Sequence, residues 1–250
     1  MRLTSDDDAV FYNAGLAVAS CKKDENGNVT LPAEASGAVV CAWKNRNDNK
    51  LYAAGSTYKV SKANEKFDAV TPNVALLEGA RVRLATTGAL KFEGTIEEFD
   101  DVKDYVKKVG ILFVKTADLT EEIAGAGATP ASLTAAGITF QKAEADAAAR
   151  FEGVLENLTD KNEMWSALPY VTVELADGTT TEFAGTYTEE NNSRSVAKVA
   201  QAAYEDRSQL KDTGYKNKVG SEFGVTGFEV LSFSPYNKTE LAILKKIFAE

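Results

Sequence analysis

The first 70 residues alternate short apolar stretches with polar turns, which predicts a unit built from strands. Residues 10–19 are apolar and are interrupted by Asn13-Ala14-Gly15, and residues 24–28 contain an Asn-Gly pair typical of a hairpin turn. Further β-rich stretches follow at residues 29–31, 38–43, 51–52, 57–60 and 66–70. Because Thr71-Pro72-Asn73 then breaks the pattern, we expect one folding unit over residues 1–71 and a second over residues 74–250.

The second unit begins with a mixture of strand and helix patterns. Residues 80–85 and 90–96 predict two paired strands, and residues 111–114 predict a short buried strand. Residues 97–109 predict a helix that Gly110 ends, because apolar side chains recur every three or four positions and acids precede lysines. The region 121–137 is rich in Ala, Gly and Thr around Pro130, which indicates a loop.

The last third predicts a hairpin followed by two helices. Alternation over residues 170–175, an Asp177-Gly178 turn and residues 180–183 indicate two antiparallel strands. Residues 191–193 offer caps for an amphipathic helix, which we expect to dock against the Val171, Val173 and Leu175 face of the hairpin. The apolar positions of that helix are Val196, Val199, Ala200, Ala203 and Tyr204. A final helix begins at Asn237.

Composition and charge remove several classes of function. The 250 residues include no histidine, which excludes Ser–His and Cys–His catalysis and His-ligated zinc. Residues 1–70 hold nine acidic and nine basic side chains, so the whole net charge of −9 falls on the remainder. The chain has no clustered basic face for nucleic acid and no apolar stretch long enough for membrane insertion. The first residues have no apolar core of a signal peptide, so we expect a signal-less protein or a piece of a longer exported one.

The candidate chemistry along the chain is sparse. Cys21 and Cys41 either form a disulfide in an exported protein or act as two small buried side chains, and we favour the second interpretation. The stretch from Asp24 to Asn28 matches only the first half of a calcium loop, so no metal site is expected. No nucleotide-binding or nucleophile motif occurs, and we expect no cofactor and no catalytic residue.

Two sets of motifs resemble known modules of bacterial surface proteins. The set within residues 29–70 resembles the Listeria–Bacteroides (internalin-B-type) repeat, which implies a small β-grasp unit; it comprises Val40-x-x-Trp43, Tyr52, Gly55, Tyr58 and Phe67-Asp68-Ala69-Val70. Ala42 stands where that repeat usually has glycine before Trp43.

The second set resembles an uncharacterised C-terminal module of secreted clostridial and ruminococcal surface proteins. It comprises Gly79-Ala80-Arg81-Val82-Arg83, Gly88-Ala89-Leu90-Lys91-Phe92, Tyr170-Val171, Asp177-Gly178 and Arg194-Ser195-Val196-Ala197-Lys198-Val199-Ala200. This resemblance implies an exported accessory module without catalytic activity.

We therefore predict an α+β fold: a small β-grasp-like N-terminal repeat and a larger antiparallel-sheet domain with three or four helices. The expected function is surface adhesion or binding, outside the cell or on its surface, to a glycan or protein of a bacterial envelope. One alternative is a structural decoration or fibre protein of a virion or surface assembly, with other structural proteins as partners. A third is an enzyme that acts through two carboxylates, which leave no spacing signature.

Several side chains are candidates for ligand binding. Trp43, Tyr52 and Tyr58 suit either the core of the first unit or a platform for sugars, and we favour the core. Arginine binds carboxylates through its planar fork, although an ion pair within the protein is the competing interpretation. The candidates that we carry forward are Arg81, Arg83, Trp165, Tyr187 and Arg194. Changing Arg194 alone separates these interpretations, because a structural role affects melting and a ligand role affects binding.

Overall fold

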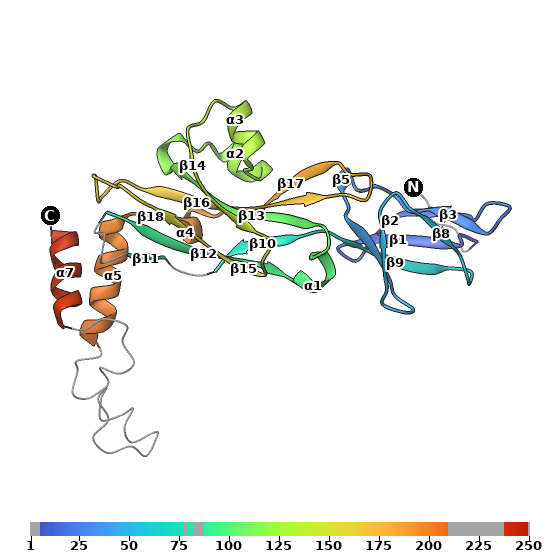
Figure 1. Cartoon of the computed structure of the whole chain (residues 1–250), viewed down its shortest axis with the longest axis horizontal. Coiled ribbons are helices and arrows are strands. Elements are labelled where there is room, and N and C mark those ends of the chain that lie inside the picture. Colours follow the sequence, from blue (N-terminus) through green and yellow to red (C-terminus); the bar gives the residue numbers. More distant parts are fainter. Residues whose placement is uncertain (1–5, 78–79, 83–87, 210–237, 250) are drawn as a thin grey trace, which may run out of the picture.

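The computed structural model describes residues 6–77, 80–82, 88–209 and 238–249. Within these ranges the chain has the predicted α+β fold, with antiparallel sheets and both short and long helices. Figure 1 shows an elongated molecule with the N-terminal strands at one end and the helices α5 (Val196–Gln209) and α7 (Lys238–Ala249) at the other. A pair of packed sheets lies between them.

The first unit is built from short strands, as the sequence predicts. The strands are β1 (Ala9–Asn13), β2 (Leu16–Cys21), β3 (Asn28–Thr30), β4 (Glu34–Ala35), β5 (Ala38–Val39), β6 (Ala42–Asn45), β7 (Leu51–Ala53), β8 (Thr57–Lys59) and β9 (Glu65–Val70). The main sheet has the order β2-β1-β9-β6-β7, with β1 and β9 parallel at its centre and a hairpin on each side. The resemblance of this unit to a β-grasp repeat stays a prediction. The Asn-Gly segment does form a turn, but β3, which follows it, pairs with β8 and not with β2.

Aromatic side chains form the core of this unit. Trp43, Phe11 and Phe67 are fully buried, and the ring centroids of Phe11 and Trp43 lie 4.8 Å apart in an edge-to-face contact. Tyr58 is also buried, and half-buried Tyr52 packs edge-on against it. The core interpretation of the tryptophan and the two tyrosines is therefore confirmed, which removes them as a platform for sugars.

Two antiparallel sheets form the centre of the second unit. One contains β10 (Asn73–Leu76), β11 (Arg81–Val82), β12 (Leu90–Glu97) and β15 (Arg150–Leu155). The other contains β13 (Val106–Lys115), β14 (Gln141–Asp146), β16 (Trp165–Glu174), β17 (Thr180–Ala184) and β18 (Ser193–Arg194). The predicted pairing of residues 80–85 with 90–96 is confirmed for its described part, β11 with β12, and the predicted hairpin is confirmed as β16 with β17.

The alternation of side chains along β13 explains how the layers pack. Val109, Ile111 and Phe113 point into the cluster shared with the first of these sheets, whereas Leu112 and Val114 belong to a cluster on the opposite face. The sheets approach so closely that a Cβ atom on Gly153 of β15 would lie 2.9 Å from the Cβ atom of Ile111. Both faces of β13 are therefore buried.

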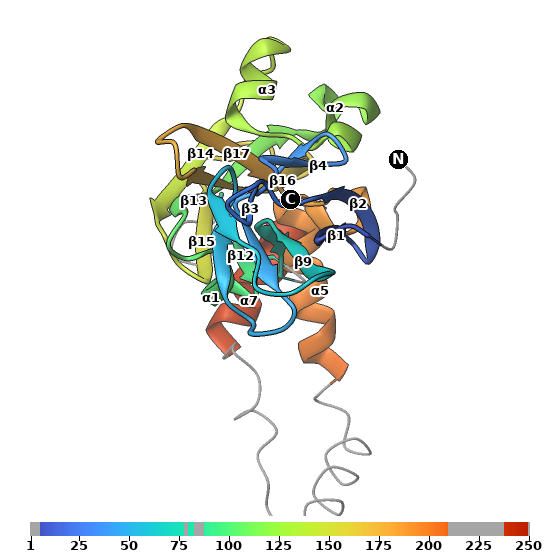
Figure 2. The same cartoon turned by 90° about the vertical axis from the view of Figure 1, so that its right-hand side faces the viewer.

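Two short helices cover that opposite face, where the sequence predicts a loop. These are α2 (Glu121–Ala126) and α3 (Pro130–Ala135), and both views place them together above the sheet (Figures 1 and 2). Thr120 caps α2, and Thr129 caps α3 with Pro130 in its first turn, a position that proline favours. The loop prediction was wrong because Pro130 starts a helix here.

The predicted helix over residues 97–109 was also wrong in its extent. Helix α1 (Phe99–Val102) is a single turn, and the chain enters β13 at Val106. Val102, Val106 and Val109 are all buried, as their apolar character predicts. Their helical spacing was misleading, because Val106 and Val109 lie on a strand. Pairing with β14 and β16 satisfies the backbone of the valine-rich segment on both sides and outweighs the helical pattern.

The two C-terminal amphipathic helices form where the sequence predicts them, but α5 packs against other elements than expected. Helix α5 is capped by Ser195, whose hydroxyl accepts a hydrogen bond from the backbone N of Lys198 at 3.2 Å. The expected capping residues, 191–193, belong instead to α4 (Glu189–Asn192) and β18. Its main contacts are with α7 and β11, at the end of β16 where Trp165 pairs with Arg194. The prediction that this helix docks mainly against the Val171, Val173 and Leu175 face is therefore wrong. Asn237 and the side chain of Tyr204 lie outside the described residues.

The two predicted units contact each other near residues 71–73. Cys41, Ala42 and Val70 of the first unit reach the main apolar cluster of the second. The Nζ atom of Lys44 lies 2.6 Å from a carboxylate oxygen of Asp101, which adds an ion pair across the junction. The boundary itself stays a prediction.

A fragment of residues 74–250 is expected to fold by itself and to melt cooperatively. Nearly all of its apolar cluster comes from its own strands and helices, so removal of the first unit costs only the contacts at the junction. Circular dichroism during heating of the fragment and of the whole chain measures this. An unfolded fragment beside a folded whole chain would mean that the first unit is an integral part of one core.

Candidate functional site

A hollow of about 770 Å³ opens on the surface where α4, β18 and α5 follow one another. We call it the α4–α5 groove. Its described lining residues are Ala80, Met164, Glu189, Glu190, Ser193, Arg194, Lys198, Val199, Ala202 and Ala203. Five of these residues are apolar, and four carry a charge. This combination is typical of a site that binds a small polar ligand or the end of a chain.

Strand pairing and a buried amide hold the α4 side of the groove in place. Ser193 and Arg194 form β18, which pairs with the beginning of β16. The buried Asn192 side chain donates from Nδ2 to the carbonyl oxygen of Ala167 at 2.8 Å and accepts at Oδ1 from the backbone N of Thr188 at 3.0 Å. The segment that carries Arg194 is therefore fixed to the sheet.

A cluster of hydroxyl groups lies behind the groove. The Oγ atom of buried Ser166 is 2.8 Å from Oγ of Ser193 and 3.0 Å from Oγ1 of Thr116. The hydroxyl oxygen of half-buried Tyr187 lies 3.1 Å from Oγ of Ser193. The Tyr187 hydroxyl is thereby tied to Ser193, and the half-buried ring packs against the apolar cluster of Leu112 and Leu168.

Arg194 is the sequence candidate that the structure places in the groove. Its Nη1 atom donates to the carbonyl oxygen of Ser193 at 2.8 Å and also to the carbonyl oxygen of Glu190. These bonds fix the plane of the guanidinium group and close the end of α4. Among the described residues, Nε and Nη2 have no partner, so the other side of the fork is available.

The charges around the groove are balanced but not paired. Glu189 and Glu190 lie on α4, and Lys198 lies in the first turn of α5 beside Arg194. Within the described ranges, none of these four side chains is within ion-pair distance of an opposite charge. Sequence reasoning missed the two glutamates and the lysine, although all lie within five residues of Arg194.

Arg81 and Trp165 are not among the described lining residues of the groove. Arg81 pairs with Glu93 across β11 and β12, with Nη1 and Oε1 3.4 Å apart, and its side chain is 70% exposed. Arg83 lies outside the described residues. Trp165 is buried in the main apolar cluster, with the Nζ atom of Lys115 5.8 Å from its ring centroid.

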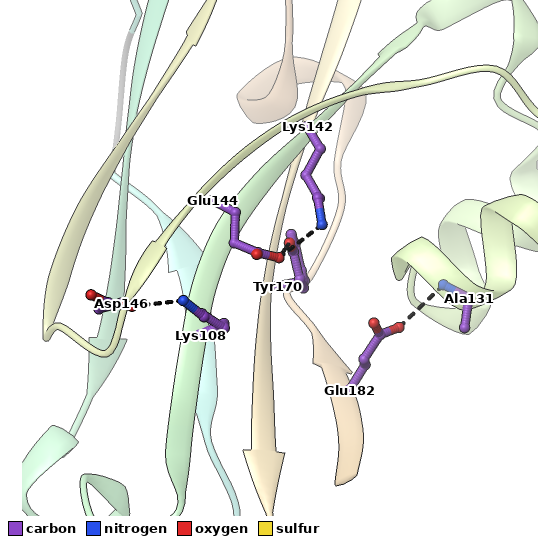
Figure 3. A network of polar contacts seen from close by, with 7 residues as sticks. All are labelled: Lys108, Ala131, Lys142, Glu144, Asp146, Tyr170 and Glu182. Atoms are coloured by element: carbon purple, nitrogen blue, oxygen red, sulfur yellow. Dashed lines mark hydrogen bonds and ion pairs between the residues drawn. The ribbon is translucent and has the colours of Figure 1, made fainter.

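A second polar network lies on the outer face of the sheet, over β13, β14 and β16 (Figure 3). The hydroxyl of buried Tyr170 donates to Oε2 of Glu144 at 2.7 Å, and Nζ of Lys142 lies 2.9 Å from the same oxygen. The hydrogen bond from Tyr170 and the charge of Lys142 lower the pKa of Glu144, and burial together with Glu144 raises the pKa of Tyr170. Figure 3 also shows Glu182 of β17 accepting a hydrogen bond from the backbone N of Ala131 in α3. The network joins strands and docks a helix.

Replacing Tyr170 with phenylalanine is expected to raise the pKa of Glu144 and to destabilise the second unit by about 1 kcal/mol at neutral pH. Because the folded-state pKa of Glu144 is lowered, this carboxylate contributes to the stability of the fold above the unfolded-state pKa, which is about 4.3. That contribution is lost as the pH falls through the folded-state pKa. An NMR titration of the Glu144 carboxyl carbon and denaturant unfolding at two pH values measure both effects. Glu144→Gln is the control. In that background the effect of Tyr170→Phe on the free energy of unfolding is expected to be independent of pH, because residue 144 no longer titrates.

The described residues contain no group of three Cys, Asp or Glu side chains placed to hold a metal ion. Asp24 instead closes its turn, with Oδ1 accepting from the backbone N atoms of Asn26 and Asn28 at 2.8 Å each. Cys21 and Cys41 are free thiols, and burial raises the pKa of Cys41 to about 12. That thiol is therefore protonated at neutral pH.

Comparisons with known proteins do not assign a family. No family model matches the chain, and no curated protein matches it. Two chains of solved structures do match, and one is the crystal structure of a DUF3823 family protein from Bacteroides uniformis. It is 9% identical, with a TM-score of 0.29, and the match covers 58% of this chain and 66% of that chain. In the part of the chain that the structure describes, no helix is long and apolar enough to cross a membrane.

Proposed function

We propose that the protein is a binding module without catalytic activity, which acts on the surface of a bacterial envelope through the α4–α5 groove. The observation that carries this proposal is the set of four charged side chains around one hollow, none paired with an opposite charge among the described residues. Glu189, Glu190 and Lys198 are exposed and Arg194 is half-buried, so water solvates these charges in the free protein, and a ligand of complementary charge is able to pair with them.

The lining of the groove favours a protein or peptide ligand over a glycan. Sugar rings stack on exposed aromatic faces, and the described lining includes no aromatic residue. Trp43 and Trp165, the two tryptophans of the chain, are both buried. Hydrogen bonding and charge are the chemistry that remains at this site, and a polypeptide offers both.

Binding to purified bacterial cell walls, before and after protease treatment, tests the proposal. Ala202→Trp fills the groove from an exposed position on α5, and Ala135→Trp on exposed α3 is the matched control. We expect at least tenfold weaker binding for the first variant, an unchanged affinity for the second, and loss of binding after protease. Binding that Ala202→Trp does not alter, or no binding to walls at all, contradicts the proposal. Release of soluble sugar from the walls would contradict the absence of catalysis.

A second candidate function, a structural subunit of a virion or surface assembly, is favoured by the free edge of the first sheet. Strand β2 ends that sheet and has no charged residue, whereas charges usually protect such edges from pairing. Leu16 at its start is 73% exposed and is the sole exposed large hydrophobic side chain of the described residues. Two copies of β2 pair antiparallel without opposing like charges, which suits a second copy of this chain.

Sedimentation of the whole chain over a range of concentrations tests this candidate. Self-association is expected, and Ala17→Lys, which adds a charge on exposed β2, is expected to abolish it. The same substitution leaves the groove untouched. A chain that stays monomeric at high concentration, or a dimer that Ala17→Lys does not weaken, rules out assembly through β2.

A further inference from the structure

We propose that the ligand of the α4–α5 groove is a peptide segment that presents a free carboxylate to Arg194 and an ammonium group to Glu189 and Glu190. This inference rests on the proposed function, because it names the ligand class of the same groove. It follows from which donors of Arg194 are already used, from the signs of the neighbouring charges and from the size of the hollow.

The guanidinium group of Arg194 is already positioned for a carboxylate. A guanidinium group has five N–H donors in one plane, and the two carbonyl oxygens of Glu190 and Ser193 occupy Nη1. The N–H groups of Nε and Nη2 lie side by side on the remaining side of the fork. Two parallel hydrogen bonds from such a pair match the two oxygens of a carboxylate. Because the protein itself fixes the plane of the fork, little conformational entropy is lost on binding.

The remaining charges of the groove specify the rest of the ligand. Lys198 adds a second positive charge on the α5 side, whereas Glu189 and Glu190 add two negative charges on α4. Two charges of each sign line the same hollow, so an ion of a single charge complements only half of them. A molecule with one carboxylate and one ammonium group satisfies both sides. The apolar surface of Val199, Ala202 and Ala203 then contacts the aliphatic part between them.

The size of the groove limits the ligand to a short segment. Its volume of about 770 Å³ falls within the range of roughly 300–1,000 Å³ that ligand pockets occupy. A segment of two or three residues with a lysine-like side chain and a free C-terminus has the required groups and fits this volume. The volume of the groove therefore suits a short terminal segment of a polypeptide.

Three dipeptide probes test the inference on the whole chain by NMR titration of the backbone amides that line the groove. The first is N-acetyl-lysyl-alanine with a free carboxylate, the second is its C-terminal amide, and the third replaces lysine with norleucine. We expect the first probe to shift the groove amides and to bind at least tenfold more tightly than either of the other two. Equal affinity of the free acid and the amide overturns the inference.

Variants of the charged residues separate ligand contact from support of the fold. Arg194→Ala is expected to reduce the affinity for the free acid to that of the amide, with no further loss for the amide itself. A structural role alone would weaken both probes equally, because it changes the shape of the groove. Glu189→Gln combined with Glu190→Gln is expected to remove the preference for lysine over norleucine, and retention of that preference contradicts the role of the glutamates.

The failure of this inference is distinguishable from the failure of the proposed function. If Ala202→Trp weakens binding to cell walls but the dipeptides do not discriminate, the groove binds another class of ligand. If neither the walls nor the dipeptides depend on the groove, the proposed function itself is wrong. If the dipeptides discriminate as expected, both proposals gain support from independent measurements.

Discussion

Replacing Gly110 with valine is expected to destabilise the second unit by at least about 3 kcal/mol and to prevent the full chain from folding normally at 37 °C. Gly110 lies in the middle of β13 with neighbours on both sides. A Cβ atom there would lie 2.5 Å from Cε1 of Tyr170 and 2.8 Å from the carbonyl oxygen of Ala143. The tyrosine is buried and the carbonyl belongs to the neighbouring strand, so neither moves without disturbing the sheet.

Denaturant unfolding of Gly110→Val and Gly110→Ala beside the unaltered chain measures this effect. Gly125→Ala is the matched control, because a Cβ atom at Gly125 in α2 meets no atom within 4 Å. There we expect a gain of about 0.5–1 kcal/mol, since alanine favours a helix more than glycine does. A valine at Gly110 that costs less than about 1 kcal/mol would mean that β13 and β16 are not packed as closely as described.

Replacing Trp43 with alanine is expected to unfold the first unit and to leave most of the second unit folded. Trp43 is fully buried, packs against Phe11, and donates from Nε1 to the carbonyl oxygen of Pro32 at 2.7 Å. Removal of a buried tryptophan costs about 3–5 kcal/mol. A unit of about 60 residues has little stability beyond that amount, so the loss exceeds what its remaining core supplies.

Amide hydrogen exchange, read residue by residue, measures this result. Protection is expected to disappear over residues 9–70 and to persist in β13 and β16. Tyr52→Phe is the control, because the half-buried ring stays and the substitution removes a hydroxyl that lies 3.3 Å from exposed Asp48. If protection vanishes along the entire chain, the two units unfold as one and the boundary near residues 71–73 is wrong.

The strands of the first unit could be predicted because their signals are local. Turn residues separate the apolar stretches of that unit, and each stretch became a strand within a few residues of its predicted position. The hairpin across Asp177-Gly178 could also be predicted from the sequence, since the turn requires a positive φ and Gly178 adopts +83°. The sequence did not indicate which strands of this unit become neighbours, and the pairing of β3 with β8 is an example.

Residues 97–109 illustrate why local periodicity is not sufficient. The spacing of Val102, Val106 and Val109 fits a helix, and all three are indeed buried. Only the presence of β14 and β16 on either side decides that the segment from Val106 onward is extended. The helices α2 and α3 show the opposite error, because residues 121–137 were predicted to form a loop although Thr120 and Thr129 are ordinary capping residues.

For the candidate site, the sequence indicated one residue of the groove and missed its charged neighbours. Arg194 was a candidate because arginine suits carboxylates, and the structure places it at the groove, where part of its fork has no partner among the described residues. Trp165 and Tyr187 were candidates on residue type alone, and burial and hydrogen bonding give both a structural role. Residue type states what a side chain is able to bind, but its exposure and its neighbours depend on the fold.

The sequence by itself determined which positions are apolar, where turns occur, and which catalytic and metal chemistries histidine's absence removes. These properties follow from side-chain chemistry and from contacts between residues close in the chain. Only the tertiary structure decided that both faces of β13 are buried, that α5 packs on α7, and that Glu189, Glu190, Arg194 and Lys198 surround one hollow. Such features depend on contacts between segments far apart in the chain, and the free energy of those contacts outweighs local preference wherever the two disagree.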